Sequence, residues 1–90
     1  MMRNDAVVSA FSRGQRARAG ALRTDGRSLW SYELKIAEKT LGGIVVADYT
    51  SGGGQFVSMT TSRHVGIARE VADTMMLPEL FESIFVKMPF

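Results

Sequence analysis

Two glycine-rich turns constrain the fold of this chain more than any other feature. Gly42 and Gly43 precede the run IVVADYT at residues 44–50, and the run SGGG at residues 51–54 follows it. Glycine supplies the positive φ angles of tight hairpin turns, and the run between them is rich in β-branched and aromatic residues. We therefore predict that residues 44–50 form the central strand of an antiparallel sheet.

A strand is predicted on each side of this central strand. In residues 29–40, LWSYELKIAEKT, the apolar residues Trp30, Tyr32, Leu34 and Ile36 alternate with polar ones. This period of two is typical of a strand with one buried face. Residues 55–60, QFVSMT, supply the third strand of a three-stranded antiparallel meander.

The hydrophobic period changes after this meander. In residues 62–76, SRHVGIAREVADTMM, the apolar side chains share one helical face, and Thr60, Thr61 or Ser62 can cap the helix start. Pro78 ends this helix and suits the first turn of another at residues 78–88. The last residues also alternate as a strand would, so their structure stays open, with helix favoured.

The C-terminal segment is unusually apolar. Its helical stripe consists of Leu80, Phe81, Ile84, Phe85 and Met88. This stripe either packs on the sheet of its own domain or forms an interface with a second copy or a partner protein.

Charge divides the chain into two parts. Residues 1–28 carry six arginines and two aspartates, a net charge of +4, whereas residues 29–90 carry five basic and seven acidic residues, a net charge of −2. We predict that residues 1–28 form a flexible basic arm with a short helix near its start. Residues 29–90 then form a single small α+β domain: the meander, a helix packed on it, and the short apolar C-terminal helix.

Composition excludes several classes of protein. The chain has 90 residues, 46% of them hydrophobic, and no cysteine, which rules out disulfides and thiolate–zinc sites. No apolar run reaches the roughly 20 residues of a membrane span, and the start does not resemble a signal peptide. These features predict a cytoplasmic protein that does not enter a membrane and that forms a homo-oligomer to bury more surface.

The segment TTSRH has the best chemistry for a site. Thr60, Thr61, Ser62, Arg63 and His64 place hydroxyl, guanidinium and imidazole groups beside the free N–H groups of a helix start, which suits an anion. The alternative is an ordinary helix cap. The glycines at 52–54 are not a nucleotide loop, because they lead into a predicted strand and have no lysine nearby.

Arg13, Arg16 and Arg18 of the arm are the predicted partners of nucleic-acid phosphates. His64 is the sole histidine, and Ser62 lies only two positions away on the same helix, where the two side chains do not face each other. We see no catalytic residues, no metal-ligand spacing and no cofactor motif, so we expect no enzyme. The aromatic residues Trp30, Tyr32, Tyr49 and Phe56 are either a stacking platform or, more commonly for such a set, core.

The segments LWSYELKIAE and VVADYTSGGGQFVSMTTSRHVGIA resemble a pattern found in small uncharacterised proteins of bacteriophages and viral metagenomes. This resemblance implies a phage accessory protein and carries no activity with it. The predicted order of helix, three strands and helix is also similar to the double-stranded-RNA-binding domain, but the lysine-rich start of that family's final helix is absent.

Two functions follow as hypotheses. The first is a non-enzymatic module that contacts nucleic-acid backbone through the arginine arm and the helix start at Thr60–His64. The alternative is an interaction or inhibitor module that acts on a host protein through the apolar C-terminal surface.

Overall fold

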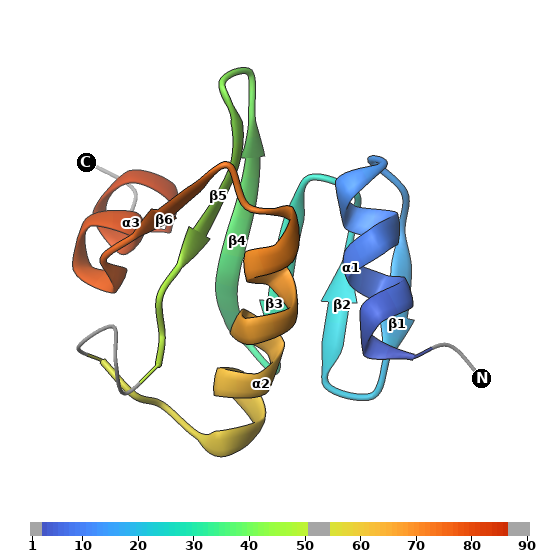
Figure 1. The fold of residues 1–90 in the computed structure, drawn as a ribbon, viewed down its shortest axis with the longest axis horizontal. Coiled ribbons are helices and arrows are strands. Elements are labelled where there is room, and N and C mark those ends of the chain that lie inside the picture. The colour runs from blue at the N-terminus through green and yellow to red at the C-terminus, as the bar shows by residue number, and fades with distance from the viewer. Residues whose placement is uncertain (1–2, 51–54, 87–90) are drawn as a thin grey trace.

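The computed structural model describes residues 3–50 and 55–86, which form a mixed sheet of six strands with three α-helices (Figure 1). The elements are α1 Asn4–Ser12, β1 Ala17–Ala19, β2 Leu22–Thr24, β3 Ser28–Ser31, β4 Leu34–Thr40, β5 Gly43–Ala47, α2 Met59–Ala68, the 3-10 turn η2 Arg69–Val71, β6 Thr74–Met76 and α3 Pro78–Phe85. The strands lie in sequence order, all antiparallel except the parallel pair β5–β6. The α+β class is therefore confirmed.

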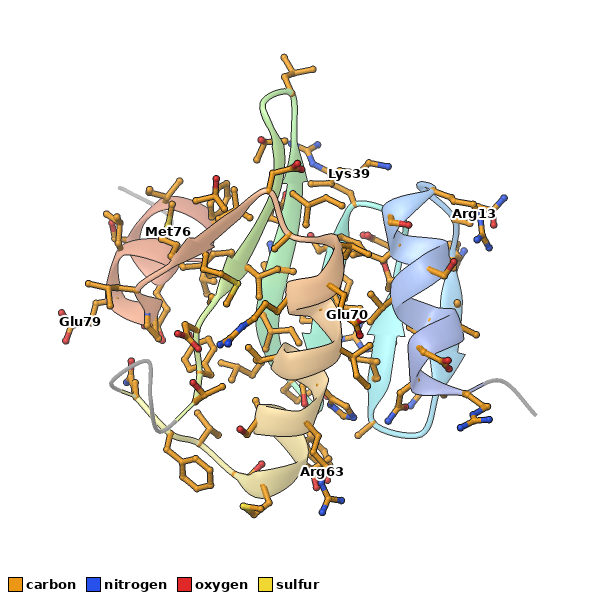
Figure 2. All side chains as sticks on the ribbon, viewed as in Figure 1. Arg13, Lys39, Arg63, Glu70, Met76 and Glu79 are labelled. Carbon is orange, nitrogen blue, oxygen red and sulfur yellow. The ribbon has the colours of Figure 1, made fainter. Side chains whose placement is uncertain are left out.

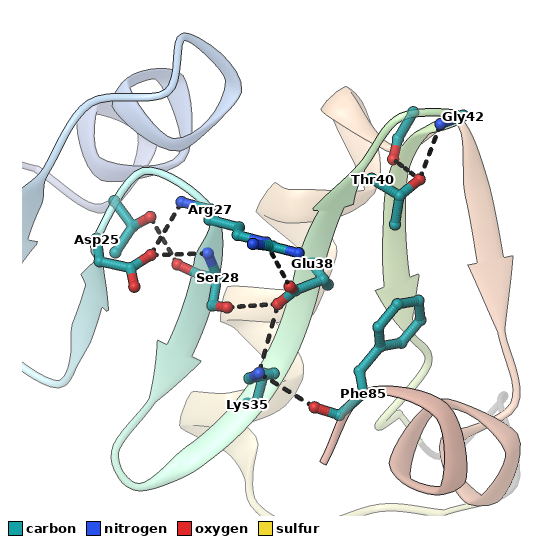
Figure 3. A network of polar contacts seen from close by, with 10 residues as sticks. Asp25, Arg27, Ser28, Lys35, Glu38, Thr40, Gly42 and Phe85 are labelled. Carbon is teal, nitrogen blue, oxygen red and sulfur yellow. Dashed lines mark hydrogen bonds and ion pairs between the residues drawn. The ribbon is translucent and has the colours of Figure 1, made fainter.

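The helices α1 and α2 lie side by side against one face of the sheet, which we call the helix face (Figure 1). Leu22 and Ser31 point toward this face, whereas the neighbouring Arg23 and Trp30 point to the other, the back face, because successive side chains of a strand alternate. The helix α3 lies over the back face at β4 and β5, where Lys35 Nζ donates to the carbonyl of Phe85 at 3.1 Å (Figure 3).

The predicted flexible arm is wrong, because residues 3–28 are part of the folded unit. The side chains of Val7, Val8 and Phe11 in α1 and of Leu22 in β2 are at most 2% exposed, and they pack in one core with Leu29. Each such side chain contributes about 1.5–3 kcal/mol when buried. Three apolar residues at helical spacing are enough to dock α1, so a high arginine content did not mean disorder. The short helix expected near the start is confirmed.

The strand predicted over residues 29–40 is in fact two strands. β3 and β4 form a hairpin in which Ser31 pairs with Leu34, and Tyr32 and Glu33 make the turn. Tyr32 has a φ of 57°, a conformation that a bulky residue rarely adopts and that costs about 1–3 kcal/mol. A two-residue turn preserves the alternation of apolar and polar residues, so the hydrophobic pattern gave no sign that the strand is interrupted.

The prediction of a third meander strand at residues 55–60 is also wrong. Gln55 to Ser58 have no regular structure, and α2 begins at Met59 with Ser58 as its cap: the Thr61 N–H donates to Ser58 Oγ at 3.1 Å. The SGGG run lies outside the described residues. The hairpin predicted at Gly42 is confirmed between β4 and β5.

The predicted helix at 62–76 ends early, at Ala68, and β6 follows it as the other neighbour of β5. The Asp73 carboxylate accepts a hydrogen bond from the Ile44 N–H at 2.8 Å and anchors this return to the sheet. The observed element order thus differs from that of the double-stranded-RNA-binding domain.

The C-terminal helix is confirmed as α3, with Pro78 in its first turn. Its predicted interface residues differ in exposure: Phe81 is buried, Phe85 is half-buried, and Leu80 and Ile84 are exposed. Met88 lies outside the described residues. Within residues 3–50 and 55–86 no helix is long and apolar enough to cross a membrane.

Candidate functional site: an anion pocket beside His64

The first turns of α2 hold the residues that the sequence singled out. Thr61 and His64 face inward and are at most 2% exposed, whereas Thr60 and Ser62 are half-buried and Arg63 is exposed. The five residues therefore do not act as one surface cluster. Only Thr60, Ser62 and Arg63 remain accessible over more than a small part of their surface.

The buried hydroxyl of Ser31 joins β3 to α2. Ser31 Oγ lies 2.6 Å from His64 Nδ1 and 3.0 Å from Thr61 Oγ1, and Ser31 itself is fully buried. Sequence reasoning missed this contact, since 33 residues separate Ser31 from His64 and nothing local connects them. The arrangement differs from a serine nucleophile with its base: the hydroxyl is shielded, and it orients the ring from Nδ1.

Ser31 contacts Nδ1 of His64, and the same histidine lines the neighbouring pocket. Burial lowers the pKa of His64 below its ordinary value, so the imidazole is neutral at pH 7. A neutral ring offers Nε2 as a donor when Nδ1 accepts from Ser31, and as an acceptor in the other tautomer.

This pocket, which we call the anion pocket, has a volume of about 830 Å³. It lies where the starts of α1 and α2 meet the β1–β2 turn (Figure 1). Its polar lining consists of Arg3, Asn4, Arg18, Tyr32, Thr60 and His64. No aspartate or glutamate lines it, and among the described residues neither Arg3 nor Arg18 has an ion-pair partner. Two arginines and the starts of two helices contribute to the lining, and this composition favours an anion.

The structure separates the three arginines predicted to contact phosphate. Arg18 lines the anion pocket, beside Thr60 and His64. Arg16 lies next to Arg18 and Arg23 in a second depression of about 500 Å³, which Asp25 also lines. Arg13 lies at the opposite end of α1 from the pocket, where Ser9 Oγ accepts from it at 2.6 Å (Figure 2). Of the two arginines that line the anion pocket, Arg3 is the one that the sequence did not single out.

The predicted aromatic platform does not assemble from its four members. Tyr49 is buried in the core, and its hydroxyl donates to Glu82 at 2.7 Å. Trp30 is half-buried on the back face under the Arg23 guanidinium, 4.3 Å from the ring centre. Tyr32 and Phe56 are 55% and 49% exposed, so core packing is wrong for these two.

A second charged cluster lies on the back face, and in it each cation contacts a carboxylate (Figure 3). The Glu38 carboxylate accepts from Ser28 and pairs with Arg27 at 3.1 Å and with Lys35 at 3.4 Å. This cluster stabilises the pairing of β3 with β4 and offers no free charge of the kind found in the anion pocket.

In the part of the chain that the structure describes, no three histidine or acidic side chains gather closely enough to hold a metal ion. The chain matches no protein-family model, no curated protein and no solved structure. The pocket's own chemistry is therefore the basis for a functional proposal.

Proposed function

We propose that this protein is a nucleic-acid-binding module that holds a backbone phosphate in the anion pocket. The observation that carries the proposal is that Arg3, Arg18 and His64, from three separate parts of the chain, line one pocket that no acidic residue lines. A phosphate is the common anion that such a set of donors suits, and a guanidinium pair matches its oxygens.

The basic surface continues beyond the pocket, which favours a polymer over a single small anion. Arg18 lines both the anion pocket and the adjoining depression of Arg16 and Arg23. Arg63 is exposed near the start of α2, at the same end of the molecule (Figure 2). Successive phosphates of a backbone can therefore meet successive arginines.

Salt dependence tests the proposal. In fluorescence anisotropy with a labelled oligonucleotide between 50 and 300 mM salt, Arg3→Gln and Arg18→Gln should each weaken binding and each reduce the slope of log K against log salt by about one. Arg13→Gln is the matched control, because it removes the same charge at the far end of α1 and should leave the slope nearly unchanged. Binding that does not respond to salt, or an equal loss in all three variants, would contradict the proposal.

The surface of α3 supports a second candidate function, self-association or binding of a partner protein. Leu77, Leu80, Ile84 and Val86 are between 45% and 66% exposed, and the helix thus shows an apolar side to solvent. Apolar side chains grouped in this way commonly mark an interface. The predicted phage origin, cytoplasmic location and non-enzymatic character stay predictions.

Light scattering tests this second candidate. We expect the wild-type protein to have twice the 9.9 kDa mass of one chain at high concentration, and Ile84→Lys to be a monomer. Glu79→Lys, an exposed change on the same helix, should remain dimeric. A wild-type mass of one chain at every concentration would contradict self-association.

A further inference from the structure

An apolar groove adjoins the anion pocket. It has a volume of about 580 Å³, within the range of small-molecule sites, and its lining includes the apolar Tyr32, Leu34 and Val57 and the acidic Glu33. Tyr32 and Thr60 line both the groove and the anion pocket, so the two depressions are neighbours. In this composite site the groove is mainly apolar, with Glu33 as its one charged lining residue, and the anion pocket is lined by two arginines.

Tyr32 stands where the two depressions meet. Its side chain is 55% exposed, and its backbone has a φ of 57° at the first position of a two-residue hairpin turn, a position that glycine occupies at no steric cost. Val57 across the groove is also half exposed, at 51%. A positive φ disfavours tyrosine at this position, and an exposed ring adds little to the stability of the core. A role in binding would explain why the residue is a tyrosine.

We propose that this groove receives one unpaired base of single-stranded nucleic acid, stacked on Tyr32, while the adjacent phosphate lies in the anion pocket. This inference rests on the proposed function and specifies its ligand. A base needs a flat apolar contact and a phosphate needs positive charge, and the composite site presents both, side by side. A duplex cannot use the groove, since its bases are already stacked and paired.

Anisotropy with ten-nucleotide thymidine and uridine strands and a duplex of the same length, at one salt concentration, tests the inference. The wild-type protein should bind a single strand at least ten-fold more tightly than the duplex, and the two strands show which sugar it prefers. Tyr32→Gly should lose about ten-fold in affinity for the single strand and little for the duplex, while its Tm rises, because glycine adopts positive φ freely.

Two further variants make the outcome decisive. Tyr32→Phe keeps the ring and should retain single-strand affinity within about two-fold, whereas Val57→Glu, at an exposed position, should lower it by repelling the strand. Unchanged single-strand affinity in Tyr32→Gly would overturn the base site, and a concurrent loss in Arg18→Gln would show that the anion pocket still acts. If the wild-type protein binds neither strand nor duplex at 50 mM salt, both proposals fall.

Discussion

The two ends of β3 carry two buried serines whose surroundings differ in charge balance. At the first end Ser28 donates to Glu38, a carboxylate that two cations also contact, Arg27 at 3.1 Å and Lys35 at 3.4 Å. Every charge of this back-face cluster thus has a partner of opposite sign (Figure 3).

At the other end Ser31 contacts His64, a ring that burial keeps neutral, and the nearby Arg3 and Arg18 form no ion pair with any described residue. Both regions are rich in basic residues, yet only in the first does each cation form an ion pair with a carboxylate. Charge that is already paired stabilises the fold, whereas charge held close together without a partner costs free energy that a bound anion would offset.

Removing the acidic centre of the back-face cluster should have the largest effect on stability. Glu38→Gln keeps the shape of a 7%-exposed side chain but removes the charge that pairs Lys35 and Arg27. We expect a loss of about 2 kcal/mol in the free energy of unfolding, near the low end for a buried pair because Arg27 stays hydrated. Urea denaturation measures it, and a change below about 0.5 kcal/mol would show that the cluster is not structural.

Ser31→Ala should have the next largest effect. It removes the hydroxyl that holds His64 and Thr61 and leaves both side chains without that partner in the core. We expect a loss of about 1–1.5 kcal/mol, together with a sharp fall in anion affinity because the His64 ring is no longer fixed. Ser28→Ala is the matched control, and it should lower stability while leaving anion affinity as it was.

The sequence predicted those parts of the fold that local chemistry determines. The hairpin at Gly42, the helix that follows Ser58 and the proline-initiated α3 all depend on residues within a few positions of one another. The capping residue was placed two to four positions too late, because three consecutive hydroxyl residues follow Ser58 and each suits a cap equally well.

The remaining elements depend on contacts between distant residues. β6 forms because Thr74–Met76 finds the free edge of β5, although the same residues also fit a helical stripe. The hairpin turn at Tyr32 could not be predicted, because its first residue has a positive φ and tyrosine rarely adopts that conformation. α1 is held by packing on β1 and β2, which no pattern within residues 1–28 reveals.

The site was half predictable for the same reason. Thr60, His64 and Arg18 were named from their chemistry, and the fold brings these three to one pocket. Arg3 and Ser31 were missed because their roles come from the meeting of α1, β3 and α2. The choice among basic residues also required the structure, since the partner of each guanidinium cannot be read from its neighbours in sequence.

The pH dependence of stability should show a smaller effect that belongs to the Ser31 end alone. Burial lowers the pKa of His64, so below its ordinary value of about 6.5 the unfolded chain binds a proton that the folded chain does not. Stability from this group is therefore complete above pH 6.5 and declines as the pH falls below it, by a few degrees of Tm. If the Tm of His64→Gln falls by the same amount between pH 7.5 and 5.5, the pH dependence belongs to another titrating group.

An added phosphate should reduce this decline. An anion in the pocket favours the protonated imidazole, so it raises the pKa of His64 toward its ordinary value. A chemical-shift titration of the single histidine with and without 10 mM phosphate measures this directly. An identical titration curve in both conditions would mean that no anion reaches the ring.

The substitutions with the smallest expected effect on stability, one in each region, give the clearest test of which region binds nucleic acid. Arg27→Gln and Arg18→Gln remove the same charge from two exposed side chains, and each should change the free energy of unfolding by no more than about 0.5 kcal/mol. Lys35 still pairs with Glu38 in the first variant, so its back-face cluster survives. Oligonucleotide affinity should fall only in Arg18→Gln. An equal fall in both variants would mean that the net charge of the protein, and not the position of its unpaired arginines, determines binding.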